Sequence, residues 1–268
     1  MALDWRHGHP SEIDGRPDYP VIDSDGHMAE HLPTPAPYLE QQGLSLEDPA
    51  LRRLVPPYGG TDVPWHDQTP TERSATRTPR GPWWSAPAKQ TIDLATALFP
   101  ALLYERLDET GIDFGVGYPS LGLFFLHAED DRFRRGACRA LNRCNAETFA
   151  PLGDRLTPVA AIPMHTPEEA VAELEYAVQV LGFKAVLCAG YVQRPSDASA
   201  ANDPQVTRYA LWLDQFGIDS AYDYDPVWAK AEELGVSIAF HSGFIGMTRY
   251  RSPISYAANH LSMLGHGQ

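Results

Sequence analysis

The sequence has little that would tie it to nucleic acid or to a membrane. Its 268 residues carry 21 Lys and Arg against 35 Asp and Glu, which gives a formal net charge of −14. A surface that follows phosphates needs clustered basic residues instead. No apolar run approaches the roughly 20 residues that span a bilayer, and the N-terminus lacks the apolar centre of a signal peptide. We therefore expect no nucleic-acid partner and no membrane partner.

Cysteine is also scarce. The chain has 3 cysteines, Cys138, Cys144 and Cys188, and none of them belongs to a C-x-x-C pair. An odd number without paired spacing argues against a disulfide scaffold. We predict small buried thiols that stay reduced in a cytoplasmic protein.

Glycine-rich nucleotide motifs are missing as well. Neither G-x-G-x-x-G nor G-x-x-x-x-G-K-[ST] follows an apolar segment, so a nucleotide-binding sheet lacks its fingerprint. The chain instead alternates short apolar runs with helical patterns over short links, which predicts βα units around a parallel sheet. The five predicted strands span about 21–26, 112–118, 157–163, 184–189 and 236–241.

Polar residues gather where these strands end. The strand ends read "DSDGHMAE", "YPS", "PMH", "CAG" and "HSG", and a (β/α)8 barrel carries its chemistry at the C-terminal ends of its strands. We predict an α/β fold of the (β/α)8 TIM-barrel type, with only the first five βα units present. Residues 1–20 form an N-terminal arm, and residues 21–268 the barrel domain, with a long irregular insertion at about 32–88.

Helix signals support this division. The segment 96–111 has helical spacing and ends at Gly111, a suitable C-terminal glycine. In the segment 166–182, Thr166 is placed to cap a helix and Pro167 to occupy its first position.

The first strand end has the composition of a metal site. On a strand, residues two apart point to the same side, so Asp25 and His27 can face one ion. His241, which ends the fifth strand, could add a third ligand across the barrel mouth. One carboxylate and two imidazoles suit Zn²⁺, Mn²⁺ or Fe²⁺. The alternative is a chance D-x-H dipeptide and a hydrogen-bonded core histidine.

The order and spacing of several blocks resemble the amidohydrolase-related family, the amidohydrolase 2 group, which includes metal-dependent aromatic and aminomuconate-type decarboxylases. The resemblance covers about residues 21–243, and it implies that Asp25, His27 and His241 are metal ligands. Asp25 stands where many members have histidine or glutamate, which leaves the metal open; zinc is our prediction, with manganese or iron as alternatives. The blocks are "VIDSDGHMAE", "LDETGIDFGVGYPSLG", "CRALNRCNAETFAPLGDRLTPVAAIPM", "EEAVAELEYAVQVLGFKAVLC" and "YDPVWAKAEELGVSIAFHSG".

Further residues are candidates for the pocket. Glu30, Tyr118 and His165 follow or end predicted strands, and we expect them to line the substrate pocket. His260 is a candidate catalytic proton carrier because histidine titrates near neutral pH. The alternative for His165 is an ordinary loop leading into a helix cap, and for His260 an exposed residue near a terminus.

The family's barrel has eight strands, with a metal-binding aspartate after the eighth. This chain ends 25 residues beyond Gly243, so we expect a truncated barrel with open sheet edges and a tendency to form homo-oligomers. We also expect Val186, Ile238 and Phe240 to line the barrel interior.

The resemblance implies a metal-dependent enzyme that acts on a small carboxylated or carbonyl-bearing molecule. The reaction would be decarboxylation, as a carboxy-lyase, or hydrolysis. The alternative is a catalytically impaired fold remnant that acts only by association with a partner.

Overall fold

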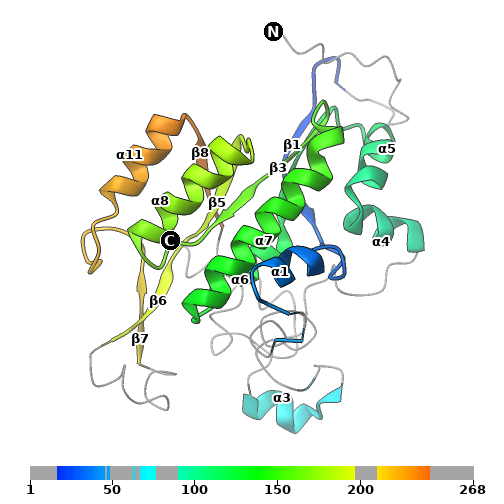
Figure 1. Cartoon of the computed structure of the whole chain (residues 1–268). Helices are drawn as coiled ribbons and strands as arrows, with labels where there is room; N and C mark the ends of the chain where they lie inside the picture. The colour runs from blue at the N-terminus through cyan, green and yellow to red at the C-terminus, as the bar shows by residue number, and fades with distance from the viewer. Residues whose placement is uncertain are drawn as a thin grey trace.

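The computed structural model describes residues 17–45, 47–48, 63, 67–76, 90–196 and 210–241, and strands and helices alternate along much of them (Figure 1). The strands are β1 (Ile22–Met28), β2 (Phe114–Pro119), β3 (Leu156–Pro158), β4 (Ala160–Ile162), β5 (Ala185–Ala189), β6 (Val192–Pro195), β7 (Leu211–Asp214) and β8 (Ser237–His241). The α-helices are α1 (Ala36–Gln41), α3 (Pro70–Thr76), α4 (Thr91–Leu98), α5 (Pro100–Thr110), α6 (Ser120–Phe125), α7 (Asp131–Phe149), α8 (Pro167–Glu175) and α11 (Asp225–Leu234).

The main strands run parallel, in the order in which the chain makes them. One ladder joins β1, β2 and β3, and a second joins β4, β5 and β8. The ladders share one stretch of chain, because β3 and β4 flank Val159, whose N–H donates to the Gly117 carbonyl at 3.0 Å. The five predicted strands are therefore confirmed in position and direction.

Asn142 of α7 explains why the pairing changes at β4. The carboxamide of Asn142 donates to the Ala161 carbonyl at 2.9 Å and accepts from the Ala161 N–H at 2.8 Å. Beyond Pro119, β2 gives way to α6 and no longer offers a strand edge. The buried side chain of Asn142 supplies the donor and acceptor that a neighbouring strand would otherwise supply.

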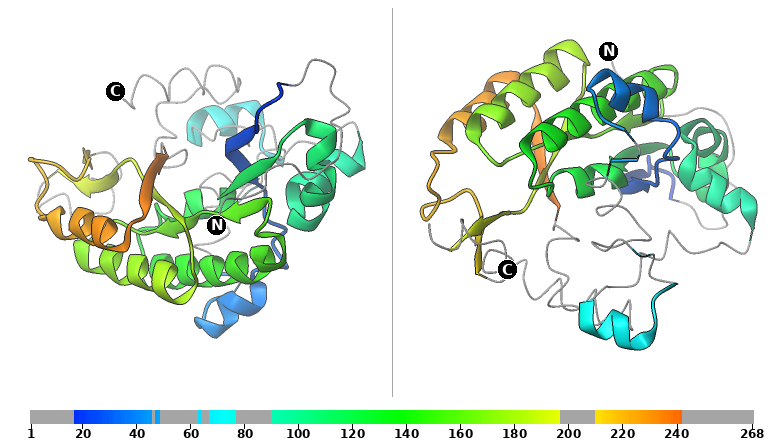
Figure 2. Two further views of the ribbon diagram at one scale, coloured as in Figure 1. Left: turned by 90° about the horizontal axis from the view of Figure 1, so that it is seen from above. Right: turned by 60° about the horizontal axis from the view of Figure 1, so that its bottom comes forward.

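The long helices cover one face of the strands. The left view of Figure 2 shows α7, α8 and α11 as a layer beneath the sheets, with β1 and β8 rising above it. Val186 is fully buried in a cluster with Leu174 of α8 and Val227 of α11, and Ile238 packs against the same cluster. The expectation that Val186, Ile238 and Phe240 line the barrel interior was wrong. Val186 and Ile238 belong to the helix-facing side of their strands, and the Phe240 ring lies against Trp228 of α11.

The segment predicted as one helix over 96–111 is two helices. Phe99 is extended, with φ −122° and ψ 107°, and Pro100 begins α5. Proline has no N–H to continue the preceding helix, and its ring disfavours a helical residue before it. Gly111 ends α5 in the left-handed conformation, at φ 71°, and Thr166 caps α8 with Pro167 in its first turn, as predicted.

The antiparallel hairpin of β6 and β7 was not predicted. It follows the fourth predicted strand and leads toward α11. Within the described part of the insertion, α1 and α3 are short helices in otherwise irregular chain, and most of the predicted N-terminal arm lies outside the described residues.

The three cysteines are buried and form no disulfide, which confirms that they are small buried thiols. A separate finding concerns membranes: no helix among the described residues is long and apolar enough to cross one.

Candidate functional site

The end of β1 contains an irregularity that presents its polar residues. The pairing with β2 runs from Asp23 opposite Gly115 to Gly26 opposite Gly117, so β1 has one more residue there than its partner. Such a bulge is a common way to re-aim side chains next to a site. The Asp23 carboxylate accepts the Asp25 N–H at 3.1 Å, and a Cβ at Gly26 would lie 2.9 Å from Asp23 Oδ2. A Cβ there would also lie 3.2 Å from the Val116 carbonyl, so glycine fits this position without a shift of its neighbours.

Two histidines from the two outermost strands of the described series meet at this end. The Nε2 atoms of His27 on β1 and His241 on β8 are 3.2 Å apart. The rings meet edge to face, with centroids 5.1 Å apart and an interplanar angle of 87°. The structure therefore brings together two residues that are 214 positions apart in the sequence, as the strand-end reasoning predicted.

This pair suits a divalent metal. Two nitrogens each about 2.0–2.1 Å from one ion, at a near-tetrahedral angle, lie about 3.3 Å apart. Burial and the neighbouring His241 lower the pKa of His27, against the opposing effects of Asp25 and Asp23. A neutral imidazole keeps the lone pair that a metal ligand needs. The donor chemistry and the nitrogen separation both fit an ion.

Asp25 lies near the pair without closing the site. Its Oδ1 is 4.0 Å from His27 Nε2, and its side chain is 84% exposed. Among the described residues, no group of three His, Cys, Asp or Glu side chains is assembled closely enough to hold an ion. The set of Asp25, His27 and His241 therefore stays a prediction, with its two imidazoles already together.

Tyr118 forms a wall beside the pair. It lies opposite His27 in the ladder between β1 and β2, and the two ring centroids are 5.8 Å apart. Burial, with a further contribution from the Asp25 charge, raises the pKa of the Tyr118 hydroxyl. Tyr118 therefore stays a neutral hydrogen-bonding group at neutral pH, next to His27.

Glu30 is a buried acid just past β1. Its Oε2 accepts the Leu121 N–H of α6 at 2.8 Å, while Oε1 is buried and has no hydrogen-bond partner among the described residues. Burial raises the pKa of Glu30 to about 8, although the bond from Leu121 opposes the shift. The carboxyl therefore holds a proton at pH 7.

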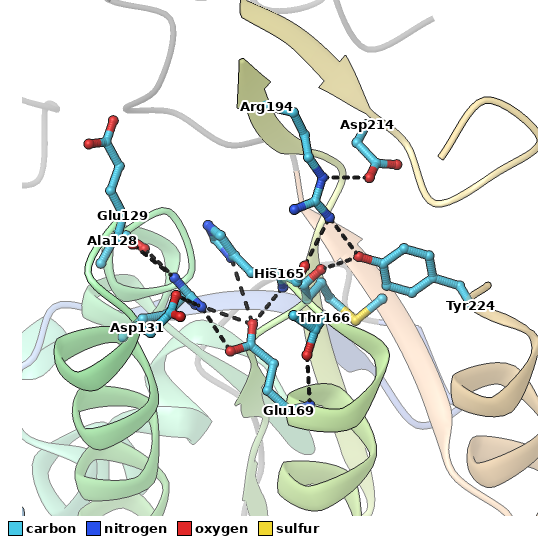
Figure 3. Close-up of polar contacts among 11 residues, drawn as sticks. Ala128, Glu129, Asp131, His165, Thr166, Glu169, Arg194, Asp214 and Tyr224 are labelled. Atoms are coloured by element: carbon cyan, nitrogen blue, oxygen red, sulfur yellow. Dashed lines mark hydrogen bonds and ion pairs between the residues drawn. The ribbon is translucent and has the colours of Figure 1, made fainter. Parts of the chain in front are cut away.

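His165 lies in a different polar network, after β4 (Figure 3). Figure 3 shows it between Glu169 on one side and Arg194, Asp214 and Tyr224 on the other. Burial, followed by the charges of Arg134, His127 and Arg194, lowers the pKa of His165 far below its usual value. The ring is therefore neutral at neutral pH.

Sequence reasoning missed the polar residues of this network. Arg134 and Glu169 are 35 positions apart and Arg194 and Asp214 are 20 apart, so no local spacing marked either pair. His260, the predicted catalytic proton carrier, lies outside the described residues.

Comparison with known proteins gives the family context. Residues 80–261 match the sequence profile of the family described as Amidohydrolase. The match begins after β1, so it includes His241 and not His27. No curated protein matches the chain.

Solved structures share the fold. A dihydroxybenzoic acid decarboxylase from Polaromonas sp. JS666, with bound manganese and the inhibitor 2-nitroresorcinol, is 20% identical with a TM-score of 0.50, and the match covers 83% of this chain and 49% of that one. An amidohydrolase from Mycobacterium avium subsp. paratuberculosis K-10 is 18% identical with a TM-score of 0.52, over 85% of this chain and 60% of that one. At such identities the likeness shows the fold alone, and it confirms the predicted (β/α)8 type. This chain spans about half the length of the first structure.

Proposed function

Because the chain belongs to the amidohydrolase family, we propose that it is part or all of a metal-dependent enzyme that acts on a small carboxylated molecule. The observation that carries the proposal is the 3.2 Å separation of His27 Nε2 and His241 Nε2 at the strand ends. Decarboxylation, as a carboxy-lyase, is the reaction we put first, and hydrolysis of a carbonyl compound is the second.

The residues have distinct tasks in this proposal. His27 and His241 would hold the ion, with Asp25 as the nearest carboxylate. A bound divalent ion would supply a Lewis acid that polarises a carboxylate or carbonyl oxygen. Tyr118 forms a wall of the pocket next to His27.

Decarboxylation requires a proton, and two residues are assigned to proton-dependent roles, Glu30 as a hydrogen-bond donor and His260 as a proton carrier. Because Glu30 keeps its proton at pH 7, it could donate a hydrogen bond to a substrate carboxylate, which an ionised acid could not do. His260 remains our predicted proton carrier.

The choice of ion follows from the ligands. Two imidazoles and a carboxylate suit Zn²⁺, which we put first, and Mn²⁺ and Fe²⁺ are the alternatives. Manganese is the ion in the Polaromonas structure, so Mn²⁺ is the second ion to test.

The test uses the full chain, stripped of metal and then reloaded with Zn²⁺ or Mn²⁺. Carbon dioxide release is measured from a panel of hydroxybenzoates, and hydrolysis from a panel of amides. We expect carbon dioxide from at least one hydroxybenzoate, with loss of more than about 100-fold in His27→Ala and His241→Ala. His31→Ala is the matched control, because His31 is exposed and its ring lies against Phe99. A metal-loaded chain that turns over neither panel would favour the alternative of a remnant that acts by association.

A further inference from the structure

Both backbone groups of His165 are held by charged side chains. The His165 N–H donates to Glu169 Oε1 at 2.6 Å, and the His165 carbonyl accepts from Arg194 Nη2 at 2.9 Å. These partners come from opposite directions along the chain, Glu169 from α8 and Arg194 from β6. The peptide of one loop residue is thereby fixed on both sides (Figure 3).

On the first side, Glu169 belongs to a buried ion pair. Arg134 of α7 binds both of its oxygens, with Nε to Oε1 at 3.2 Å and Nη2 to Oε2 at 2.8 Å. The side chains of Arg134 and Glu169 are 1% and 5% exposed. Arg134 also donates to the Ala128 carbonyl at 2.8 Å and to Asp131 Oδ1 at 2.6 Å. This two-point geometry orients the Glu169 carboxylate as well as neutralising it.

On the second side, Arg194 is also held by a buried acid, through a single contact. Its Nε donates to Asp214 Oδ2 at 2.8 Å, and the Asp214 side chain is fully buried. Its Nη2 also donates to the Tyr224 hydroxyl at 3.0 Å, and that hydroxyl donates to the Met164 carbonyl at 2.6 Å. The residue before His165 is therefore tied to the same assembly.

Burying an ion pair costs free energy of desolvation. Replacing both charged residues by apolar residues of similar size often leaves a protein equally stable or more stable. Two buried ion pairs converging on one residue therefore point to orientation of that residue rather than to stability. The residue oriented is His165, which follows β4 at the end of the strands where a barrel carries its chemistry.

The ring of His165 has one covered and one open edge. Nδ1 is buried, lies 3.8 Å from Glu169 Oε1 and has no hydrogen-bond partner in the part of the chain that the structure describes. The side chain as a whole is 16% exposed, so the edge that solvent reaches is the opposite one, which carries Nε2. A carboxylate on the Nδ1 side favours the tautomer with its proton on Nδ1 and leaves the Nε2 lone pair outward.

We propose that His165 contacts the substrate, with its outward Nε2 accepting a hydrogen bond from a substrate hydroxyl group, and that Glu169 and Arg194 are positioning residues that fix its ring. A neutral ring suits this task, since an imidazolium would have no lone pair to offer. The hydroxyl contact rests on the proposed function, whereas the tautomer and the fixed orientation rest on the network alone.

The first arm of the test measures the tautomer and needs no substrate. Long-range ¹H–¹⁵N spectra of the full chain labelled at histidine give the protonation state of each ring, and the His165 signals are those missing from His165→Gln. The expected result is one neutral tautomer with its proton on Nδ1, unchanged from pH 5 to pH 8. In Glu169→Gln the ring should sample both tautomers. The charged groups that the pH series must account for are Arg134, Arg194 and His127. A proton on Nε2 in the wild type, or titration near pH 6.5, would overturn the orientation.

The second arm measures specificity with metal-loaded protein, comparing 2,6-dihydroxybenzoate with benzoate as substrates or competing ligands. Loss of the His165 acceptor in His165→Leu should reduce the preference for the hydroxylated acid by about tenfold, and His165→Gln should restore part of it through its amide oxygen. Arg194→Lys should show a smaller loss. An unchanged preference in His165→Leu, or binding of neither acid by the wild type, overturns the hydroxyl contact. Failure of the proposed function would give a different result from failure of the hydroxyl contact. In that case the wild type itself would not bind metal.

Discussion

A pair of histidines and a single histidine lie at the ends of the parallel strands, and their surroundings differ. His27 and His241 approach each other from the outermost described strands, and the exposed Asp25 carboxylate lies 4.0 Å from His27 Nε2. His165 lies among buried ion pairs that hold its backbone from both sides. In our proposal the histidine pair binds a metal ion, whereas the acids and arginines around His165 are paired within the chain.

The difference matches the two roles that we propose, metal binding for His27 and His241 and substrate positioning around His165. Donor atoms that hold a ligand must stay available, so few protein groups neutralise them. Groups that orient a neighbour must be held themselves, and they need low exposure and two-point contacts. We expect variants of the residues around His165 to cost stability, and variants of His27 and His241 to cost binding with little loss of stability.

The largest effect on stability should follow from Arg134→Ala. The change leaves Glu169 buried without its cation, which costs about 3–5 kcal/mol of unfolding free energy. Urea unfolding measures it. Arg106→Ala is the control, because Arg106 pairs with the half-exposed acids Asp93 and Glu109, and such pairs contribute about 0–1 kcal/mol. Equal losses in the two variants would break the comparison.

A smaller loss is expected from Asn142→Ala. The variant leaves the N–H and the carbonyl of Ala161 buried without a partner, which costs about 2–4 kcal/mol by the same urea measurement. Hydrogen exchange should show the Ala161 amide losing protection before the amides of β5. An Ala161 amide that stays as protected as in the wild type would contradict the role of Asn142 as a substitute strand edge.

Glu30→Gln should change how stability depends on pH. The unfolded state releases this proton near pH 4.5 and the folded state near pH 8, so the folded state binds more protons between these values. The contribution of Glu30 to the free energy of unfolding is fully present below pH 4.5 and is lost as pH rises through about 8. From pH 5 to pH 7 the wild type should lose roughly 2–3 kcal/mol through this group.

Glu30→Gln should lose none of that amount, and Glu105→Gln, an exposed position on α5, should behave as the wild type. Unfolding free energies at pH 5 and pH 7 measure both variants. A wild type and a Glu30→Gln variant with parallel pH profiles would show that Glu30 titrates normally.

The smallest effect on stability should come from His27→Ala. His27 is part-buried and lies one residue before the end of its strand, and without metal its removal should cost under about 1 kcal/mol. With metal present, the wild type should gain stability through binding and the variant should not. Thermal unfolding with and without Zn²⁺ measures this, and an equal gain in both would mean that the ion binds elsewhere.

The sequence was sufficient for the strands and for the meeting of His27 and His241. Apolar runs of strand length located the ladders, and the polar residues at their ends identified the site. The same reasoning failed for Val186, Ile238 and Phe240, which were assigned to the interior because they are apolar. Side chains alternate along a strand, so once His241 faces His27, Ile238 must face the helices.

The long-range polar pairs could not be predicted. Arg134 meets Glu169 only because α7 and α8 both pack on the strands, and Arg194 meets Asp214 only because of an antiparallel hairpin. No local pattern specifies contacts of this kind. The break between α4 and α5, in contrast, could have been predicted from the sequence, because Pro100 begins α5.

The central claim is that His27 and His241 together hold one divalent ion, and metal titration of the stripped chain tests it most directly. Isothermal titration with Zn²⁺ and then Mn²⁺, checked by elemental analysis after dialysis, gives the stoichiometry and the affinity. We predict near one tightly held equivalent in the wild type and in His165→Leu, and weak or no binding in His27→Ala and in His241→Ala. An ion held equally well by both single-histidine variants, or lost from the wild type to mild chelation, would contradict the account.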